Sequence, residues 1–541
     1  MTFVFKEVGS KQLVLGLLFT MLLSFAITRQ SLWMDEGFTV WFASPKSFGS
    51  FFSTLLGSRG APGDPQMVFY LFYMWCWVKV WGASEIALRA ANIPFAILLL
   101  AAISWASRTL FRQPSAWLIL CLSPFMWFYM NEARPYIAVM AFAALVMVAE
   151  LAYLTHPANY RVFAPWCCLT ALLLASAIHI LGVLLIPSMI TLFVITTWNQ
   201  PAFRKTFLRD WSPALLSLLP AFLALGAFFL WTSRFGVNMK RADPGIANLA
   251  FVFYEFCGFA GLGPPRDELR ENPHVHALVG YWPWLLIGIA AAIAVGSVVL
   301  RATSDRASRN LAISLLAGLS IAFMVAKIAH FQLLGRHVAV FFPLLFILLL
   351  SWSPSPAPSR TSRYLGALAL TSLGIAWGIS DFRLVLLPQY QKESYRAASS
   401  ISLTRVAQNA GKILWAADSH TASYYGVRVV ELPLAPESAA GDRYSNVTWP
   451  VHGQAIDVGN WTIERAADYL NRRDAPLVLV LSRPDLYDEH GAWRTLVEEQ
   501  RPTLVSQMTE FQIYEWRARK QDGIASLQSS RPRPALSGAS Q

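Results

Sequence analysis

The chain is 541 residues long, and 55% of its residues are hydrophobic while only 14% are charged. An ordinary soluble domain has roughly 25% charged residues, so the composition excludes an entirely soluble protein. The net charge of +12 is uneven, because residues 1–382 carry 26 basic and 15 acidic side chains and residues 383–541 carry 18 and 17. The sequence therefore predicts two units in different solvents, and it does not favour nucleic-acid binding.

Apolar runs predict that the first unit is a polytopic transmembrane helical bundle. A membrane-spanning helix needs about 17–25 mostly apolar residues. The first run is expected to remain as an anchor, because no small-residue cleavage site follows it before Trp33. Eleven runs qualify, at about residues 12–28, 91–107, 114–130, 137–154, 164–179, 181–198, 213–232, 281–300, 311–328, 337–352 and 364–382.

The apolar and aromatic run 67–81 is short and contains Lys79. Whether it spans the membrane decides the side on which every later loop lies. If it does not span and the N-terminus is cytoplasmic, the basic loops fall on the cytoplasmic side, as expected for a membrane protein. We therefore predict a helix lying in the outer interface over these residues. The outward face then contains the long loop 29–90, short loops near 131–136, 179–180 and 329–336, a loop at 233–280, and the C-terminal part.

Residues 383–522 predict a small extracytoplasmic α/β domain. Residues 412–418 and 477–482 are predicted to be buried strands, and residues 464–473 and 492–500 are predicted to be helices. The Ser-, Pro- and Arg-rich residues 523–541 are expected to be disordered. The domain organisation is thus a membrane unit 1–382 followed by a soluble domain and a tail.

Ionisable residues gather on the predicted outward face. Singly, each is more often a helix-start acid or a charge that sets topology. Charge is costly at the edge of a membrane, so several such features on one face favour a functional site. Carboxylates opposed by arginines and histidine suit a substrate with an anionic leaving group and a hydroxyl acceptor. The residues are Asp35, Glu36, Glu132, Arg134, Tyr136, His179, Arg336 and His337.

These motifs resemble the GT-C-fold glycosyltransferases that use polyprenyl-phosphate sugars, in particular the family 39-like group of protein O-mannosyltransferases and lipid A aminoarabinose transferases. The resemblance rests on residues 33–36, 64–89, 131–136 and 335–337, in that order, and it covers about residues 10–350. It implies a cavity at the outer membrane face and a donor whose lipid stays in the bilayer.

The same resemblance implies roles for individual residues. Asp35 would be the catalytic carboxylate, and Glu36 would be its neighbour on the acceptor or nucleophile-orienting side. Arg89, Arg134 and Arg336 would be candidates for holding the phosphate. The full set of expected substrate-binding residues is Arg89, Glu132, Arg134, Tyr136, His179, Arg336 and His337.

The expected function is transfer of a sugar from a polyprenyl-phosphate donor to an acceptor hydroxyl or amine at the outer face of the membrane. Asp35 is expected to take the acceptor proton, and a single base with in-line attack predicts inversion. Adjacent residues on a helix point about 100° apart, so Asp35 and Glu36 are expected to do different jobs. The sequence predicts no required cofactor and shows no metal-ligand spacing, and it leaves a divalent ion open.

Three alternatives remain open. A transporter or flippase for an anionic lipid or solute predicts charges near the bilayer midplane rather than at one face. The others are a non-catalytic membrane scaffold and an oligosaccharyl- or lipid-ligase with a diphosphate donor. The expected partners are the lipid-linked donor, membrane lipid, and a glycan, lipid or protein acceptor. The expected location is a bacterial inner membrane, with the C-terminal domain in the periplasm.

Overall fold

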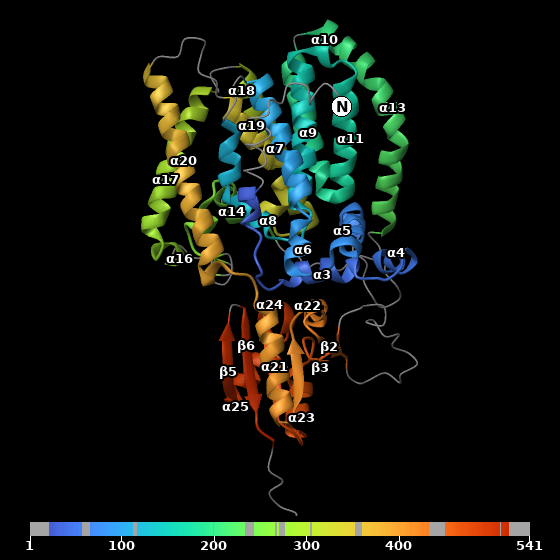
Figure 1. Ribbon diagram of the computed structural model, residues 1–541, viewed down its shortest axis with the longest axis vertical. Coiled ribbons are helices and arrows are strands. Elements are labelled where there is room, and N and C mark those ends of the chain that lie inside the picture. The colour runs from blue at the N-terminus through green and yellow to red at the C-terminus, as the bar shows by residue number, and fades with distance from the viewer. Residues whose placement is uncertain are drawn as a thin grey trace, which may run out of the picture. The chain divides into compact units, whose positions relative to one another are not determined.

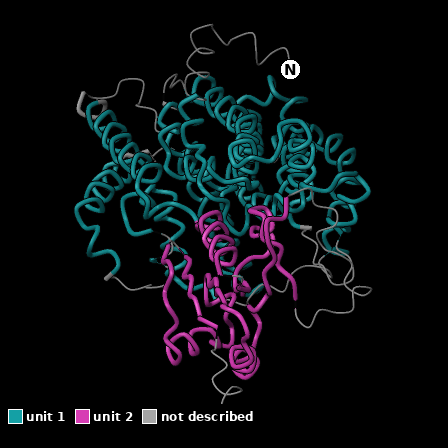
Figure 2. The backbone as a smooth tube through the Cα atoms, turned by 60° about the horizontal axis from the view of Figure 1, so that its bottom comes forward, with its two compact units in different colours: residues 1–392, 443–448 teal, residues 393–442, 449–541 magenta. Residues whose placement is uncertain are grey.

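The computed structural model describes residues 21–56, 65–111, 116–198, 200–232, 243–265, 268–269, 276–302, 306–351, 360–409, 411–431, 450–508 and 510–518. These residues form two compact units, which Figure 2 shows in different colours. The first unit ends at Lys392 rather than at the predicted Phe382. The reason is that helix α20 (Arg360–Leu386) and the 3-10 helix η7 (Pro388–Tyr390) carry the membrane unit past the predicted end.

Unit 1 is a bundle of apolar helices (Figure 1). Six described segments are long and apolar enough to cross a membrane, and all six coincide with predicted spans, so the chain is an integral membrane protein. The segments contain helices α7 (Ile93–Thr109), α9 (Tyr136–Thr155), α12 (Leu185–Thr197), α13 (Pro201–Thr232), α18 (Arg306–Ala329) and α20.

Three further predicted spans are also helical, the second as a continuous helix of 21 residues and the third as two consecutive helices. They correspond to α11 (Phe163–Ile178), α17 (Trp282–Ala302), and η6 (Gly335–Phe341) followed by α19 (Phe342–Ser351). The prediction of one continuous span at 114–130 is wrong, because η2 (Ala116–Leu122) and α8 (Pro124–Met130) are separate helices. Pro124 has no N–H to continue the helix, and the extended backbone of Ser123 before it breaks the run. The first predicted span lies largely outside the described residues.

The long first loop forms helices at one end of the bundle, opposite α10 (Pro157–Tyr160) (Figure 1). The predicted interfacial helix is α5 (Val68–Trp81), whose 14 residues are too few to span a bilayer. Its Trp75 indole donates to the Pro45 carbonyl at 2.8 Å, and its Tyr73 hydroxyl donates to the Ala91 carbonyl at 2.9 Å. The other helices of this loop are α3 (Met34–Ala43), α4 (Phe48–Leu56), η1 (Pro65–Met67) and α6 (Glu85–Ala90).

Helix α9 is the centre of the bundle, and nearly all of its side chains are buried. It packs between α7 and α11. Its first residue, Tyr136, lies two residues after Arg134, which donates to Asp35 and Thr39 of α3. Further along, α12 and α18 are joined by reciprocal hydrogen bonds in which Ser188 and Ser314 each donate to the other's carbonyl, at 3.0 and 2.6 Å. The remaining elements are η3 (Ile180–Leu184), α14 (Ile246–Phe256), η5 (Phe259–Gly261) and α16 (His276–Val279).

Unit 2 is an α/β domain around a six-stranded sheet with the order β2-β3-β1-β4-β6-β5. Strands β2, β3, β1 and β4 are parallel, whereas β6 and β5 are antiparallel to their neighbours. The strands are β1 (Lys412–Ala416), β2 (Val427–Val430), β3 (Gly453–Asp457), β4 (Leu477–Ser482), β5 (Thr503–Met508) and β6 (Phe511–Trp516). The helices are α21 (Tyr395–Asn409), α22 (Ser419–Tyr424), α23 (Ile463–Asn471), α24 (Pro484–Tyr487) and α25 (Ala492–Gln500).

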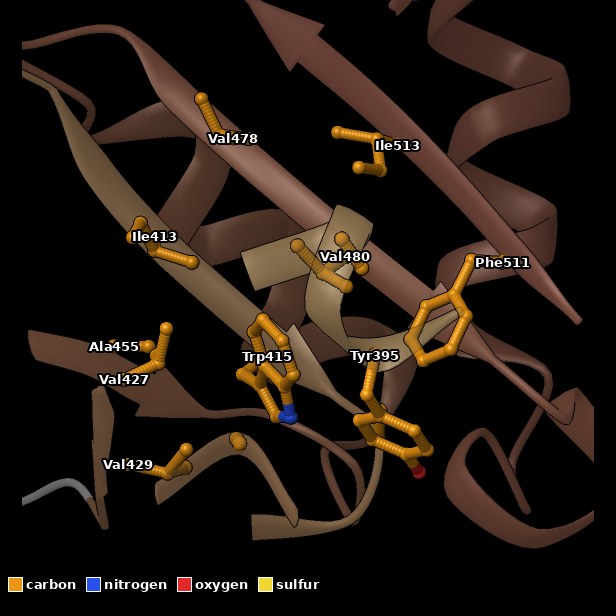
Figure 3. Packing of buried hydrophobic residues seen from close by; sticks show 13 residues of the cluster. Tyr395, Ile413, Trp415, Val427, Val429, Ala455, Val478, Val480, Phe511 and Ile513 are labelled. Atoms are coloured by element: carbon orange, nitrogen blue, oxygen red, sulfur yellow. The ribbon is translucent and has the colours of Figure 1, made fainter. Parts of the chain in front are cut away.

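The sheet is covered on both faces, because successive strand side chains point to opposite sides. Trp415 of β1 and Val480 of β4 pack with Tyr395 of α21 in one apolar cluster (Figure 3). Their strand neighbours pack on the other face with side chains of α23 and α25, including Trp493. Burial on both faces explains why strands β1 and β4 are continuous apolar runs in the sequence. The predicted tail 523–541 lies outside the described residues.

Candidate active site

The two adjacent acids Asp35 and Glu36 lie in the first turn of α3, where acidic residues are favoured by the helix dipole. Their side chains diverge, as expected for consecutive helical positions. The Asp35 side chain is 20% exposed, whereas the Glu36 side chain is completely buried. The pair is therefore divided into one accessible carboxylate and one carboxylate inside the protein.

Glu36 is surrounded by cations and donors. Arg89 of α6 binds it with two N–H groups, at 2.9 Å to Oε1 and 2.8 Å to Oε2. The Ala133 amide donates to Oε1 at 2.8 Å, and the Lys392 ammonium lies 3.2 Å from Oε2. Burial alone would raise the pKa of Glu36, but Arg89 and Lys392 outweigh burial and lower this pKa to about 2.

Arg89 is fully buried and uses every N–H donor within the protein. Besides the two bonds to Glu36, its guanidinium donates to the carbonyls of Thr28, Gln30 and Ser31 at 2.9–3.1 Å. No N–H of Arg89 is left for a phosphate in this arrangement, contrary to the role that the resemblance implied. Arg89 instead ties the chain before α3 to α6.

Asp35 is paired with Arg336, which follows Gly335 at the start of η6. Arg336 Nη1 donates to Asp35 Oδ2 at 2.9 Å, and the Arg336 side chain is 24% exposed. The guanidinium also lies over the Trp33 ring, 5.5 Å from its centroid. The Gly335 amide donates to Glu255 Oε2 at 2.7 Å, which fixes the backbone that carries Arg336.

Arg134 and His179 lie on the same side of α3 as Asp35. Arg134 donates to the Asp35 carbonyl at 3.2 Å and to the Thr39 hydroxyl at 3.1 Å. The His179 ring lies 6.3 Å from the Tyr136 ring, measured between centroids. Burial, with help from the nearby Arg134 and Arg336, lowers the pKa of His179 to about 3. His179 is therefore neutral, and its Nδ1 accepts from the Leu181 amide at 3.1 Å.

Glu132 and His337 have positions that also support the fold of the site. The Glu132 side chain is buried 4.0 Å from Lys392, and its backbone carbonyl accepts from the Asn92 amide side chain at 2.6 Å. His337 accepts from the Leu334 amide at 3.2 Å through Nδ1, which closes the start of η6. Of the residues predicted from the sequence, Arg89, Arg134 and Arg336 contact the first turn of α3. The others lie next to these contacts: Glu132, Tyr136, His179 and His337.

Two charged residues at this site were missed by the sequence analysis. Lys392 lies beyond the last predicted span, in a segment that had been assigned to the soluble domain. Glu255 lies in α14, whose 11 residues are too few to be counted as a span. The sequence feature that could have indicated Glu255 is that it is a single carboxylate within an apolar run.

The described residues contain no group of three or more His, Cys, Asp and Glu side chains that could hold a metal ion. What they do provide is a partly exposed carboxylate, Asp35, paired with the Arg336 guanidinium, and a second guanidinium, Arg134, that donates to the Asp35 backbone carbonyl. Such a site can accept a proton at the carboxylate and stabilise negative charge at the guanidinium groups.

Comparison with known proteins gives a match at the level of structure. No family model matches the chain, and no curated protein matches it. The crystal structure of ArnT from Cupriavidus metallidurans bound to undecaprenyl phosphate matches with a TM-score of 0.52 and 14% identity, over 94% of this chain and 98% of that chain. The apo state of the same protein gives a TM-score of 0.52 and 12% identity over the same shares. The chain has the GT-C fold.

The GT-C fold was the fold predicted from the sequence, including the small C-terminal domain with strands. Arabinosyltransferase EmbB from Mycobacterium smegmatis is a more distant structure, with a TM-score of 0.36 over 69% of this chain and 37% of that chain. The two ArnT structures, at 14% and 12% identity, establish the GT-C architecture alone. The chemistry has to be argued from the side chains at the end of the bundle.

Proposed function

We propose that this protein is an integral-membrane glycosyltransferase that transfers a sugar from a polyprenyl-phosphate donor to an acceptor hydroxyl or amine at the outer face of the membrane. The observation that carries the proposal is the partly exposed Asp35 carboxylate, 2.9 Å from Arg336, at one end of a GT-C bundle. The related ArnT structure contains undecaprenyl phosphate, which supports a polyprenyl-linked donor.

In the proposed reaction, the acceptor O–H or N–H loses its proton to Asp35 while the acceptor atom bonds to the anomeric carbon. The bond from that carbon to the phosphate oxygen breaks, and the electron pair leaves with the polyprenyl phosphate. Positive charge develops on the sugar and negative charge on the phosphate, so a base is needed on one side and cations on the other. In-line attack assisted by one base leads to inversion.

Arg336 has a double role in this scheme. Without donor it pairs with Asp35, and an incoming phosphate competes for the same guanidinium because charge-assisted bonds to phosphate are strong. Donor binding thereby releases the carboxylate to act as a base. Arg134 is the second proposed phosphate ligand. Tyr136, His179, His337 and Glu132 are proposed to shape the cavity around the sugar.

Glu36 and Arg89 receive a different assignment from the one that the sequence predicted. Their mutual pairing and complete burial support a role in holding the first loop in place, so we assign neither of them to substrate. The C-terminal domain is proposed to face the periplasm and to help select the acceptor.

The decisive experiment measures sugar transfer from a polyprenyl-phosphate donor by purified wild-type and Asp35→Asn proteins. Asparagine keeps the size of the side chain but cannot take the proton, so turnover should fall roughly 10²–10⁴-fold while donor binding survives. Glu85→Gln is the matched control, because Glu85 is also an acid in the first turn of a helix in the same loop. A near-normal rate for Asp35→Asn would remove the base assignment and would favour the transporter alternative.

A further inference from the structure

A lysine after the last helix of unit 1 reaches the carboxylate next to Asp35. Lys392 follows η7, and its ammonium donates to the Asn131 carbonyl. The same nitrogen lies 3.2 Å from Glu36 Oε2 and 4.0 Å from Glu132 Oε1. The Lys392 side chain is only 8% exposed. A buried ammonium is costly, so this cation must be compensated by the carboxylates that it meets.

Lys392 and Arg89 hold Glu36 through its side chain from different parts of the chain. Arg89 comes from α6, 53 residues after Glu36, and Lys392 comes from the far end of unit 1. Glu36 is the residue after Asp35 in the first turn of α3. Any rotation or shift of that turn would move both carboxylates together, because their backbones are joined.

We propose that Lys392 is a positioning residue for the transfer reaction. By fixing Glu36 it fixes the first turn of α3, and so keeps the Asp35 carboxylate aimed at the acceptor group. This inference rests on the proposed function of Asp35. It assigns a role to the segment between the last helix of the bundle and the sheet domain, which the resemblance to known enzymes did not cover.

A small pocket lies beside Lys392, lined by residues 26 and 30 of the chain before α3 and by side chains of α8, α20 and η7. Its lining includes the polar residues Gln30, Asn131 and Tyr390 together with Lys392 itself. Burial lowers the pKa of Lys392 to about 8, although Glu36 and Glu132 oppose the shift and Arg89 adds to it. Above this pH, Lys392 becomes neutral and Glu36 keeps a single charged partner.

The test compares wild type with Lys392→Met and Lys392→Arg in the transfer assay between pH 6.5 and 9.5. Lys392→Met should lower kcat at least tenfold and leave the donor KM unchanged, because the phosphate ligands are intact. In wild type, kcat should decline above pH 8 as Lys392 becomes neutral. Lys392→Arg should recover most of kcat and should not show this decline, because arginine stays charged there. Lys327→Met is the control, because Lys327 forms an exposed ion pair with Asp243.

Two results would overturn the positioning role. The first is that Lys392→Met has the same kcat and the same pH profile as wild type. The second is that the kcat of Lys392→Arg is as low as that of Lys392→Met. Competitive labelling of the wild-type protein with an amine-reactive reagent provides a readout that needs no turnover. Lys392 should become reactive near pH 8, while an ordinary value near 10.5 would contradict the inference. If Asp35→Asn were fully active, the proposed function would fail while this labelling result would stand.

Discussion

Glu36 carries a charge inside the protein, and its partners come from several segments of the chain. We predict that Glu36→Gln lowers the free energy of unfolding by about 3–5 kcal/mol, because it leaves the buried Arg89 without its carboxylate. The measurement is thermal unfolding in detergent. Asp35→Asn serves as the comparison, and its unfolding midpoint should stay close to that of wild type because Asp35 is partly exposed. Equal stability of the two variants would contradict the buried-pair assignment.

His179 makes the stability of the protein sensitive to acid. Its pKa is about 3 in the folded protein, against an ordinary value of 6.5. Between pH 3 and pH 6.5, His179 therefore binds a proton in the unfolded chain but not in the folded protein. Stability is therefore full above pH 6.5 and should fall by about 1.4 kcal/mol per pH unit as the pH decreases below it. Glu36, with a pKa of about 2, adds a further loss only below about pH 4.5.

Unfolding midpoints measured between pH 7 and pH 4.5 test this prediction. His179→Asn should flatten the slope in that window, because asparagine keeps a side-chain acceptor for the Leu181 amide and does not titrate. An unchanged slope in the variant would show that other groups cause the acid sensitivity.

The sequence could predict most of the side chains around Asp35, because the spans and the basic loops together place residues 131–136, 179 and 336 on one face. It could not predict which of them face the cavity. Burial of Arg89 and pairing of Arg336 with Asp35 depend on contacts between distant segments, with a separation of 301 residues in the second case. Lys392 was missed for the same reason, since no local pattern links it to Glu36.

Only glycine fits at the first position of η6, Gly335, without displacing a neighbouring side chain. A Cβ on Gly335 would fall on Glu255 Oε2, so the amide that now donates to this carboxylate would have to move. Gly335→Ala should therefore displace Arg336, raise the donor KM, and lower kcat/KM at least tenfold. Gly280→Ala is the matched control, because a Cβ there meets no atom within 4 Å. Equal kinetics of the two alanine variants would sink the prediction.

Elements with strong local patterns were the most predictable. Strand β4 and helix α25 occur at the predicted residues, because one is a continuous apolar run and the other has clear helical spacing. The break at Pro124 was missed because counting apolar residues ignores the proline. Helix α14 was missed because 11 residues fall below the length that a span requires.

For the whole molecule, the basic loops predict that the connection at α10 is cytoplasmic and that unit 2 is on the opposite side. Asn159 and Glu498 are exposed positions in these two parts. In a cysteine-free background, Glu498→Cys should react with a membrane-impermeant maleimide in spheroplasts, and Asn159→Cys should react only after lysis. Labelling of both positions before lysis would contradict the topology.

The contact between Asp35 and Arg336 also determines the stage of protein synthesis at which the site can form. Asp35 is made early, whereas Arg336 follows 301 residues later, and Lys392 is made 261 residues after the Asn131 carbonyl that it binds. During synthesis, Asp35 therefore leaves the ribosome long before Arg336 and Lys392. A chain that stops growing before α20, the last helix of the bundle, contains Asp35 and Glu36 but lacks Lys392. Translation must therefore reach the end of the membrane unit before the proposed site is complete.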